Sequence, residues 1–117
     1  MIPITYDLIS DLTFTINMNE EVFVKVNGTS SYCVLSIKVP ETAQCIVQST
    51  IASNEFTNLI ETTYADCLWE DIKVNGISLP IISESVSSTT FWSPNLLYFK
   101  NVSLSELPIQ VSLRGNR

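Results

Sequence analysis

The sequence has no histidine in its 117 residues. Histidine is the usual general base near neutral pH and the commonest metal ligand, so neither a Ser-His-Asp nor a Cys-His arrangement can form within this chain. A serine-lysine site normally places serine three residues before the lysine, and none of the four lysines has a serine there. The sequence therefore predicts no catalytic residue and a protein that is not an enzyme.

Glycine and cysteine are also scarce, with three residues of each. Three scattered glycines cannot build a phosphate-binding loop or a dinucleotide fingerprint. The cysteines form no CxxC pair and lack an imidazole to complete a zinc site, so we expect buried free thiols, no metal and no cofactor. A third alternative, a calcium-dependent module or a small hydrolase, would use the acidic residues Glu61, Asp66, Glu70 and Asp71, although their spacing matches no EF-hand loop.

Positive charge is limited to six residues against twelve acidic ones, which gives a net charge of −6. No basic stripe can neutralise a row of phosphates, which argues against nucleic-acid and anionic-lipid partners. A helix needs about 20 consecutive apolar residues to cross a bilayer, and every apolar run in this sequence is much shorter. The first ten residues lack the basic region and the cleavage site of a signal peptide. We therefore expect no membrane association and synthesis in the cytoplasm.

What the chain does contain is typical of β-structure. Ser, Thr and Asn supply 35 residues and Val plus Ile another 23, while only 15% of the residues are charged. Branched side chains fit a pleated surface and are weak helix formers. The length suits one domain over residues 1–117, because no linker or composition shift divides it.

Alternating polarity predicts the strands. Residues 12–18 place Leu12, Phe14, Ile16 and Met18 on one face and Thr or Asn on the other. Similar short runs, separated by turn residues, occur at 22–26, 32–39, 44–52, 71–74, 77–82, 86–92, 95–104 and 107–113. This spacing predicts a two-sheet antiparallel β-sandwich or jelly roll.

One segment departs from this pattern. Between residues 53 and 68, apolar residues recur at the three-and-four spacing of one helix face, and Ser53 or Asn54 would cap the start. We therefore predict a short helical insertion there. The alternative is a long loop followed by a strand, because Thr62 and Thr63 are poor helix residues.

The strings VKVNGTS (24–30) and IKVNGIS (72–78) raise the question of a repeat, but the similarity ends outside the turn. Asn-Gly between alternating runs favours a type I′ hairpin. For the second string this sets Val74 opposite Ile77, and residue 72 opposite 79. Pro80, which cannot donate a hydrogen bond, would then mark an outer edge and a candidate partner-binding position. The first string is compatible with a longer loop.

Residues 1–10 form a possible N-terminal arm. Ile2, Ile4, Tyr6 and Leu8 alternate with polar residues, and Pro3 excludes a central strand. The segment is predicted to be either an edge strand of its own sheet or an arm that reaches a neighbouring subunit by strand exchange. Under the second alternative the four alternating residues bind a partner.

Aromatic residues provide the alternative binding hypothesis. Trp69 and Trp92 could present flat faces to sugar rings, as in a carbohydrate-binding module, whereas packing in a core or an interface is the commoner role of such residues.

Taken together, these features predict a non-enzymatic structural or interaction protein that assembles in several copies. The class that fits is a virion component of a phage or virus, such as a capsid decoration, tail or fibre-associated protein. Its partners would be further copies of itself or other virion subunits, with a glycan as the alternative ligand. The expected location is the virion, after synthesis in the host cytoplasm.

Overall fold

The computed structural model describes residues 4–8, 10–26, 32–50, 68–90 and 96–116. These residues form eleven strands and no helix. The strands are β1 (Ile4–Leu8), β2 (Asp11–Ile16), β3 (Glu21–Val26), β4 (Tyr32–Lys38), β5 (Cys45–Thr50), β6 (Glu70–Asp71), β7 (Lys73–Val74), β8 (Ile77–Ser78), β9 (Val86–Thr90), β10 (Leu96–Asn101) and β11 (Leu107–Asn116).

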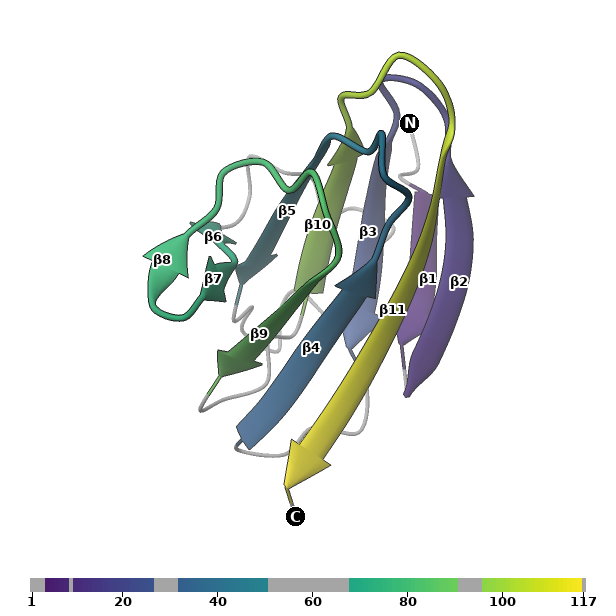
Figure 1. The fold of residues 1–117 in the computed structure, drawn as a ribbon. Coiled ribbons are helices and arrows are strands. Elements are labelled where there is room, and N and C mark those ends of the chain that lie inside the picture. Colours follow the sequence, from purple (N-terminus) through teal and green to yellow (C-terminus); the bar gives the residue numbers. More distant parts are fainter. Residues whose placement is uncertain (1–3, 9, 27–31, 51–67, 91–95, 117) are drawn as a thin grey trace.

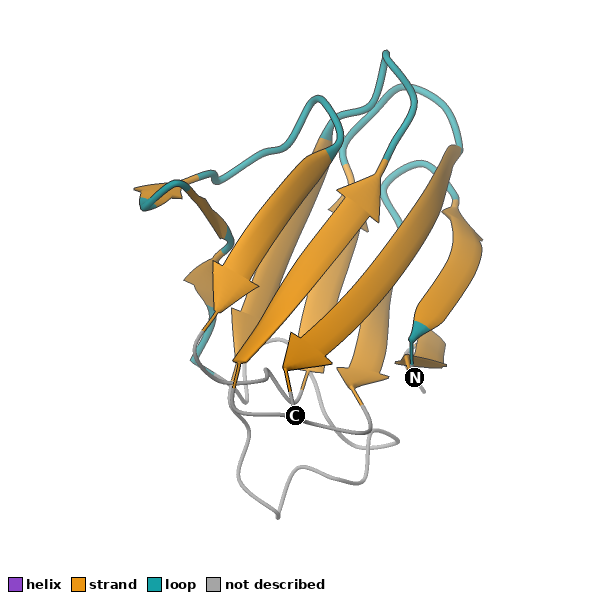
Figure 2. Ribbon diagram, turned by 60° about the horizontal axis from the view of Figure 1, so that its bottom comes forward, coloured by secondary structure: helices purple, strands orange, loops and turns teal. Residues whose placement is uncertain are grey.

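Two sheets face each other across a common core (Figure 1). One has five strands in the order β1-β3-β10-β5-β6, and the other has four in the order β2-β11-β4-β9. The small β7–β8 hairpin projects at the side of this sandwich, and Figure 2 shows the two layers from another direction. The predicted all-β sandwich is confirmed.

One pair of strands is parallel. β1 runs parallel to β3, with Tyr6 opposite Val24, while the other pairs are antiparallel. The cause is the order of the strands, because the chain leaves β1, crosses to β2 in the other sheet and returns as β3. The predicted sandwich was antiparallel, and this one pair departs from that pattern.

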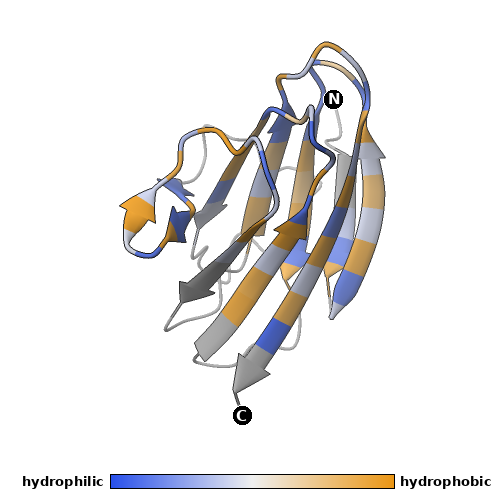
Figure 3. Ribbon diagram, viewed as in Figure 1, coloured by the Kyte–Doolittle hydropathy of each residue, from blue (hydrophilic) through white to orange (hydrophobic). Residues whose placement is uncertain are grey.

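The core follows the alternation of the strands (Figure 3). Inward-facing side chains from both sheets form a single buried cluster, to which β2, β3, β10 and β11 contribute Phe14, Ile16, Val22, Val24, Leu97, Phe99, Ile109 and Val111. The Phe14 ring meets the Phe99 ring edge-on, with centroids 5.4 Å apart. Tyr6 stacks on Phe14 at 5.0 Å. This stack joins β1 of one sheet to β2 of the other.

Some strands end earlier than predicted. β2 stops at Ile16, and Met18 lies in a turn with 53% of its surface exposed. The turn is fixed by Asn19, which has φ 63°, and by the Glu20 amide, which donates to the Asn17 carbonyl at 3.0 Å. Asn tolerates this left-handed conformation better than most residues, so the chain can reverse here and Met18 is not inward-facing.

The hairpin at residues 72–79 has the predicted register. Val74 lies opposite Ile77 and Lys73 opposite Ser78. Asn75 and Gly76 both have positive φ, of 54° and 80°, as a type I′ turn requires. The Leu79 amide donates to the Ile72 carbonyl at 2.9 Å. The strand itself ends at Ser78, before the exposed Pro80, and not at residue 82 as predicted.

A buried asparagine ties the strand connections together at one end of the sandwich. Asn101 is fully buried, and its Nδ2 donates to the carbonyls of Ile16, at 2.9 Å, and Ser105, at 2.8 Å. Its Oδ1 accepts the Ser103 amide at 2.8 Å. A single side chain therefore bonds to three backbone groups, one at the end of β2 and two in the connection between β10 and β11.

The predicted helical insertion at 53–68 lies outside the described residues, except for Leu68, which is exposed and not helical. The turn of the first Asn-Gly string also lies outside them. In the part of the chain that the structure describes, no segment forms a helix of the length and apolarity that a bilayer crossing requires.

Candidate functional site

The outer face of the four-stranded sheet is polar and uncovered by any described strand. We call it the hydroxyl face, and it consists of Asp11, Thr13, Thr15, Val34, Ser36, Lys38, Ser85, Ser87, Pro108, Gln110, Ser112 and Arg114. Each of these side chains is exposed or half-buried. The residues between them in the strands point into the core, so alternation alone builds this surface.

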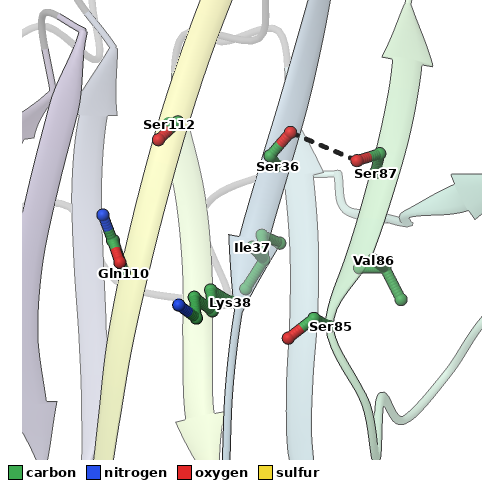
Figure 4. A pocket seen from close by; sticks show the side chains of 8 residues that line it. All are labelled: Ser36, Ile37, Lys38, Ser85, Val86, Ser87, Gln110 and Ser112. Carbon is green, nitrogen blue, oxygen red and sulfur yellow. Dashed lines mark hydrogen bonds between the residues drawn. The ribbon is translucent and has the colours of Figure 1, made fainter.

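One row of the hydroxyl face crosses all four strands. The strand registers place Asp11, Ser112, Ser36 and Ser87 side by side. The Ser112 hydroxyl donates to Asp11 Oδ1 at 2.8 Å, and the Ser36 and Ser87 hydroxyls are hydrogen-bonded to each other at 3.2 Å (Figure 4). Their donors and acceptors are fixed in position by the sheet rather than by flexible loops.

A shallow depression of about 480 Å³ lies over β4, β9 and β11. Figure 4 shows that its polar side chains come from all three strands. It is lined by Ser36, Ile37, Lys38, Ser85, Val86, Ser87, Gln110 and Ser112. Ser85 is itself anchored, because its hydroxyl accepts the Val39 amide at 3.0 Å and lies 3.3 Å from the Val39 carbonyl. Hydroxyl, amide and ammonium groups suit a polar ligand or another polar protein surface.

The charges of the hydroxyl face nearly balance. Arg114 Nη2 lies 3.3 Å from Asp11 Oδ1. The Ser112 hydroxyl, more than Arg114, lowers the pKa of Asp11 below its ordinary value of 3.8. Lys38 is the third charged residue of the face. This surface therefore carries one acid and two bases, in a chain whose net charge is −6.

The outer face of the five-stranded sheet is different, because an aromatic cluster covers part of it. Phe23 and Tyr98 are opposite each other on β3 and β10, with 3% and 5% of their surfaces exposed. Trp69 packs against both, with centroid distances of 6.1 Å and 5.7 Å. Trp69 is half-buried, so its ring is engaged in packing. Extending the predicted register of the 72–79 hairpin would set Trp69 opposite Ile82, but Ile82 forms a bridge with Cys45 instead.

The predicted partner-binding residues are divided between surface and core. Leu8 is fully buried in the core, as expected if β1 is an edge strand of its own sheet. Tyr6 is half-buried against Phe14, and Pro80 is exposed. β1 lies at the edge of its own sheet, and the side chain of Ile4 on this strand is outside the described part of the structure. Ile2 and Trp92 lie outside the described residues.

Of the residues considered for chemistry, the structure describes the surroundings of Cys45, Glu70 and Asp71. Burial raises the pKa of the Cys45 thiol to about 12, so this cysteine is inert near neutral pH. Glu70 and Asp71 are neighbours on β6, where Asp71 accepts a hydrogen bond from Gln48 at 2.9 Å, while Glu61 and Asp66 lie outside the described residues. Among the described residues, no three acidic or cysteine side chains gather to hold a metal ion.

The sequence reasoning missed the hydroxyl face. The signal was present in the outward positions of residues 11–16, 32–38, 85–90 and 107–116, which are mostly Ser, Thr and Gln. Those positions are far apart in the chain, and only the strand order brings them onto one surface.

Comparisons with known proteins add little to this picture. No protein-family model and no curated protein match the sequence. Among solved structures, CorA, described as a surface-associated copper-binding protein of Methylomicrobium album BG8, is similar with a TM-score of 0.48 and 6% identity over 98% of this chain and 99% of that one. The pre-peptidase C-terminal domain of a Bacillus anthracis collagenase is similar with a TM-score of 0.41 and 8% identity over 96% and 94%. Similarities this distant carry no functional argument.

Proposed function

We propose that this protein is a non-enzymatic structural subunit that assembles in several copies, as a virion component of a phage or virus does when it decorates a capsid or belongs to a tail or fibre. The observation that carries the proposal is the hydroxyl face, a rigid polar surface of four strands without a described cover. A sheet face of this kind can pack against another protein through hydrogen bonds without exposing a large apolar patch in the free subunit.

The charge distribution supports the same function. Among the acidic residues that the structure describes, only Asp11 lies on the hydroxyl face, so two copies can approach through it without opposing many carboxylates. The other described acidic residues lie away from this face, and the net negative charge of the chain favours solubility of the free subunit.

Two measurements test this proposal. Sedimentation velocity over a range of protein concentrations measures self-association, and we expect oligomers that grow with concentration. Density-gradient fractionation of particles from cells that encode the protein, with detection by a specific antibody, measures incorporation. We expect the protein to sediment with intact particles. Failure to self-associate together with absence from every particle fraction would refute the proposed function.

Carbohydrate binding is the second candidate, and the depression over β4, β9 and β11 supports it. Its serines, Gln110 and Lys38 offer the donors and acceptors that sugar hydroxyls require. The aromatic version of this hypothesis is weaker for Trp69, since its ring packs on Phe23 and Tyr98. A glycan array compares the native chain with Gln110→Ala, Trp69→Ala and Trp92→Ala. A glycan signal that Gln110→Ala removes would favour the depression, and no signal at all would reject this function.

A further inference from the structure

Strand β2 is a free sheet edge. It is the outermost strand of the four-stranded sheet, and no described strand pairs with its outer side (Figure 1). It is six residues long, which is a full-length strand for pairing. An edge of this length presents a row of backbone donors and acceptors that another strand can complete.

The register identifies which backbone groups are available. The Leu113 amide donates to the Ser10 carbonyl at 2.8 Å, so residues 10 and 113 form a hydrogen-bonded pair. Hydrogen-bonded pairs alternate along an antiparallel ladder, so the even-numbered residues of β2 bond to β11. The amides and carbonyls of Asp11, Thr13 and Thr15 therefore point away from the sheet.

Two of the other edges are protected in ways that β2 is not. β6 is two residues long, and β7 lies against β9. Short strands, edge charges and covering elements are the usual means of preventing unwanted strand pairing. β2 contains no proline or lysine, and its single charge, Asp11, is already bound to Ser112 and Arg114.

We propose that β2 pairs with β2 of a second copy, in antiparallel orientation about Thr13, to join two four-stranded sheets into one. This inference rests on the multi-copy assembly proposed above and names one interface for it. The pairing is two-fold symmetric, so each copy contributes the same surface. It sets Thr13 opposite Thr13 of the second copy, and Asp11 opposite Thr15.

The side chains of β2 are complementary to themselves in this register. No like charges are opposed, because Asp11 faces a threonine hydroxyl that can donate to it. On the inner side, the half-buried Leu12 lies opposite Phe14 of the second copy, so two apolar side chains are paired. All outward backbone groups of Asp11, Thr13 and Thr15 find partners, and the hydroxyl face continues across the junction.

Two lysine variants test the register by sedimentation velocity. Thr13→Lys places like charges opposite each other at the two-fold axis, so we expect the dissociation constant of the dimer to rise at least about tenfold. Thr15→Lys is the matched control, because the new lysine faces Asp11 of the second copy, and we expect the dimer to persist. Both positions are exposed on the same strand, and circular dichroism and thermal melting check that each variant folds.

Cysteine variants give a second, independent readout. In the proposed pair, the Cα atoms of the two Thr13 residues are about 5.5 Å apart, which a disulfide can bridge. Mild oxidation of Thr13→Cys should give a reducible covalent dimer. Thr15→Cys is the control, because the two copies of that residue are about 14 Å apart along the strands. The native chain, with its own three cysteines, measures the background.

The possible outcomes separate this inference from the proposed function. A dimer that Thr13→Lys weakens and Thr15→Lys does not, together with crosslinking at position 13 alone, supports the β2 interface. An oligomer that neither lysine changes and that position 13 does not crosslink overturns the β2 interface while leaving assembly in place. A native chain that stays monomeric at every concentration and is absent from particles overturns both.

Discussion

The two sheets differ in what their outer faces do. On the five-stranded sheet, Phe23 and Tyr98 lie on the side away from the core and are nevertheless buried, with Trp69 packed against both. On the four-stranded sheet, the corresponding side is the hydroxyl face, which is exposed or half-buried throughout. The first sheet is therefore stabilised on both sides, and the second on one side only.

This difference separates residues that hold the fold from residues that are available for contact. The aromatic cluster removes apolar surface from water on a face that alternation would leave polar. The hydroxyl face contributes little apolar burial, and its side chains are exposed or half-buried, where another molecule can contact them. Substitutions on the two faces should therefore have different effects on stability.

The largest effect is expected at Phe23. Phe23→Ala removes a buried ring from the outer face, and we expect a loss of about 3 kcal/mol in the free energy of unfolding, since a cavity remains. Phe23→Leu retains most of the volume and should cost about 1 kcal/mol. Denaturant unfolding followed by tryptophan fluorescence measures both. A loss below about 0.5 kcal/mol for the alanine variant would show that this face is not part of the stable structure.

A smaller effect is expected at Trp69, because its ring is only half-buried. Trp69→Ala should lower the free energy of unfolding by about 2 kcal/mol, through lost packing on Phe23 and Tyr98. Trp69→Phe keeps an aromatic ring in contact and should lose less. Differential scanning calorimetry of the two variants checks the order. If Trp69→Ala is as stable as the native chain, the ring lies free on the surface, and the sugar-stacking hypothesis becomes stronger.

Alternation made the inner faces predictable. The valines of β3 and the pair Phe14 and Ile16 were assigned inward from local sequence, because period two is a property of each strand alone. The Asn75-Gly76 turn was predictable for a similar reason, since two adjacent positive φ angles are required by the turn and tolerated by these residues.

The second buried layer was not predictable in this way. Phe23 alternates in phase with Lys25 and Glu21, which predicts an outward, exposed side chain. Its burial involves Tyr98 and Trp69, which approach from distant parts of the chain. The role of Asn101 depends likewise on the Ile16 and Ser105 carbonyls, which meet only once two turns have formed. Tertiary contacts of this kind leave no periodic signal in the sequence.

On the hydroxyl face, the serine pair should contribute little to stability. Ser36→Ala and Ser87→Ala each remove one exposed hydrogen bond, so we expect changes below about 0.5 kcal/mol in the free energy of unfolding. If this face is an interface, the same variants should instead weaken self-association in sedimentation velocity. A large loss of stability from either variant would contradict the division between the two faces.

The smallest effect is expected from the charged end of the same row, and it depends on pH. Ser112 and Arg114 lower the pKa of Asp11 in the folded chain. Their contacts with the Asp11 carboxylate therefore stabilise the fold at pH values above the ordinary pKa of 3.8, and this stabilisation is lost as the pH falls through the lowered pKa. The native chain should therefore lose slightly more stability on acidification below about pH 4 than Asp11→Asn does. Urea midpoints of both chains at neutral and acidic pH measure the difference. Equal acid sensitivity would mean that the Asp11 contacts do not persist in solution, and that the charge on the edge strand β2 is not neutralised by its neighbours.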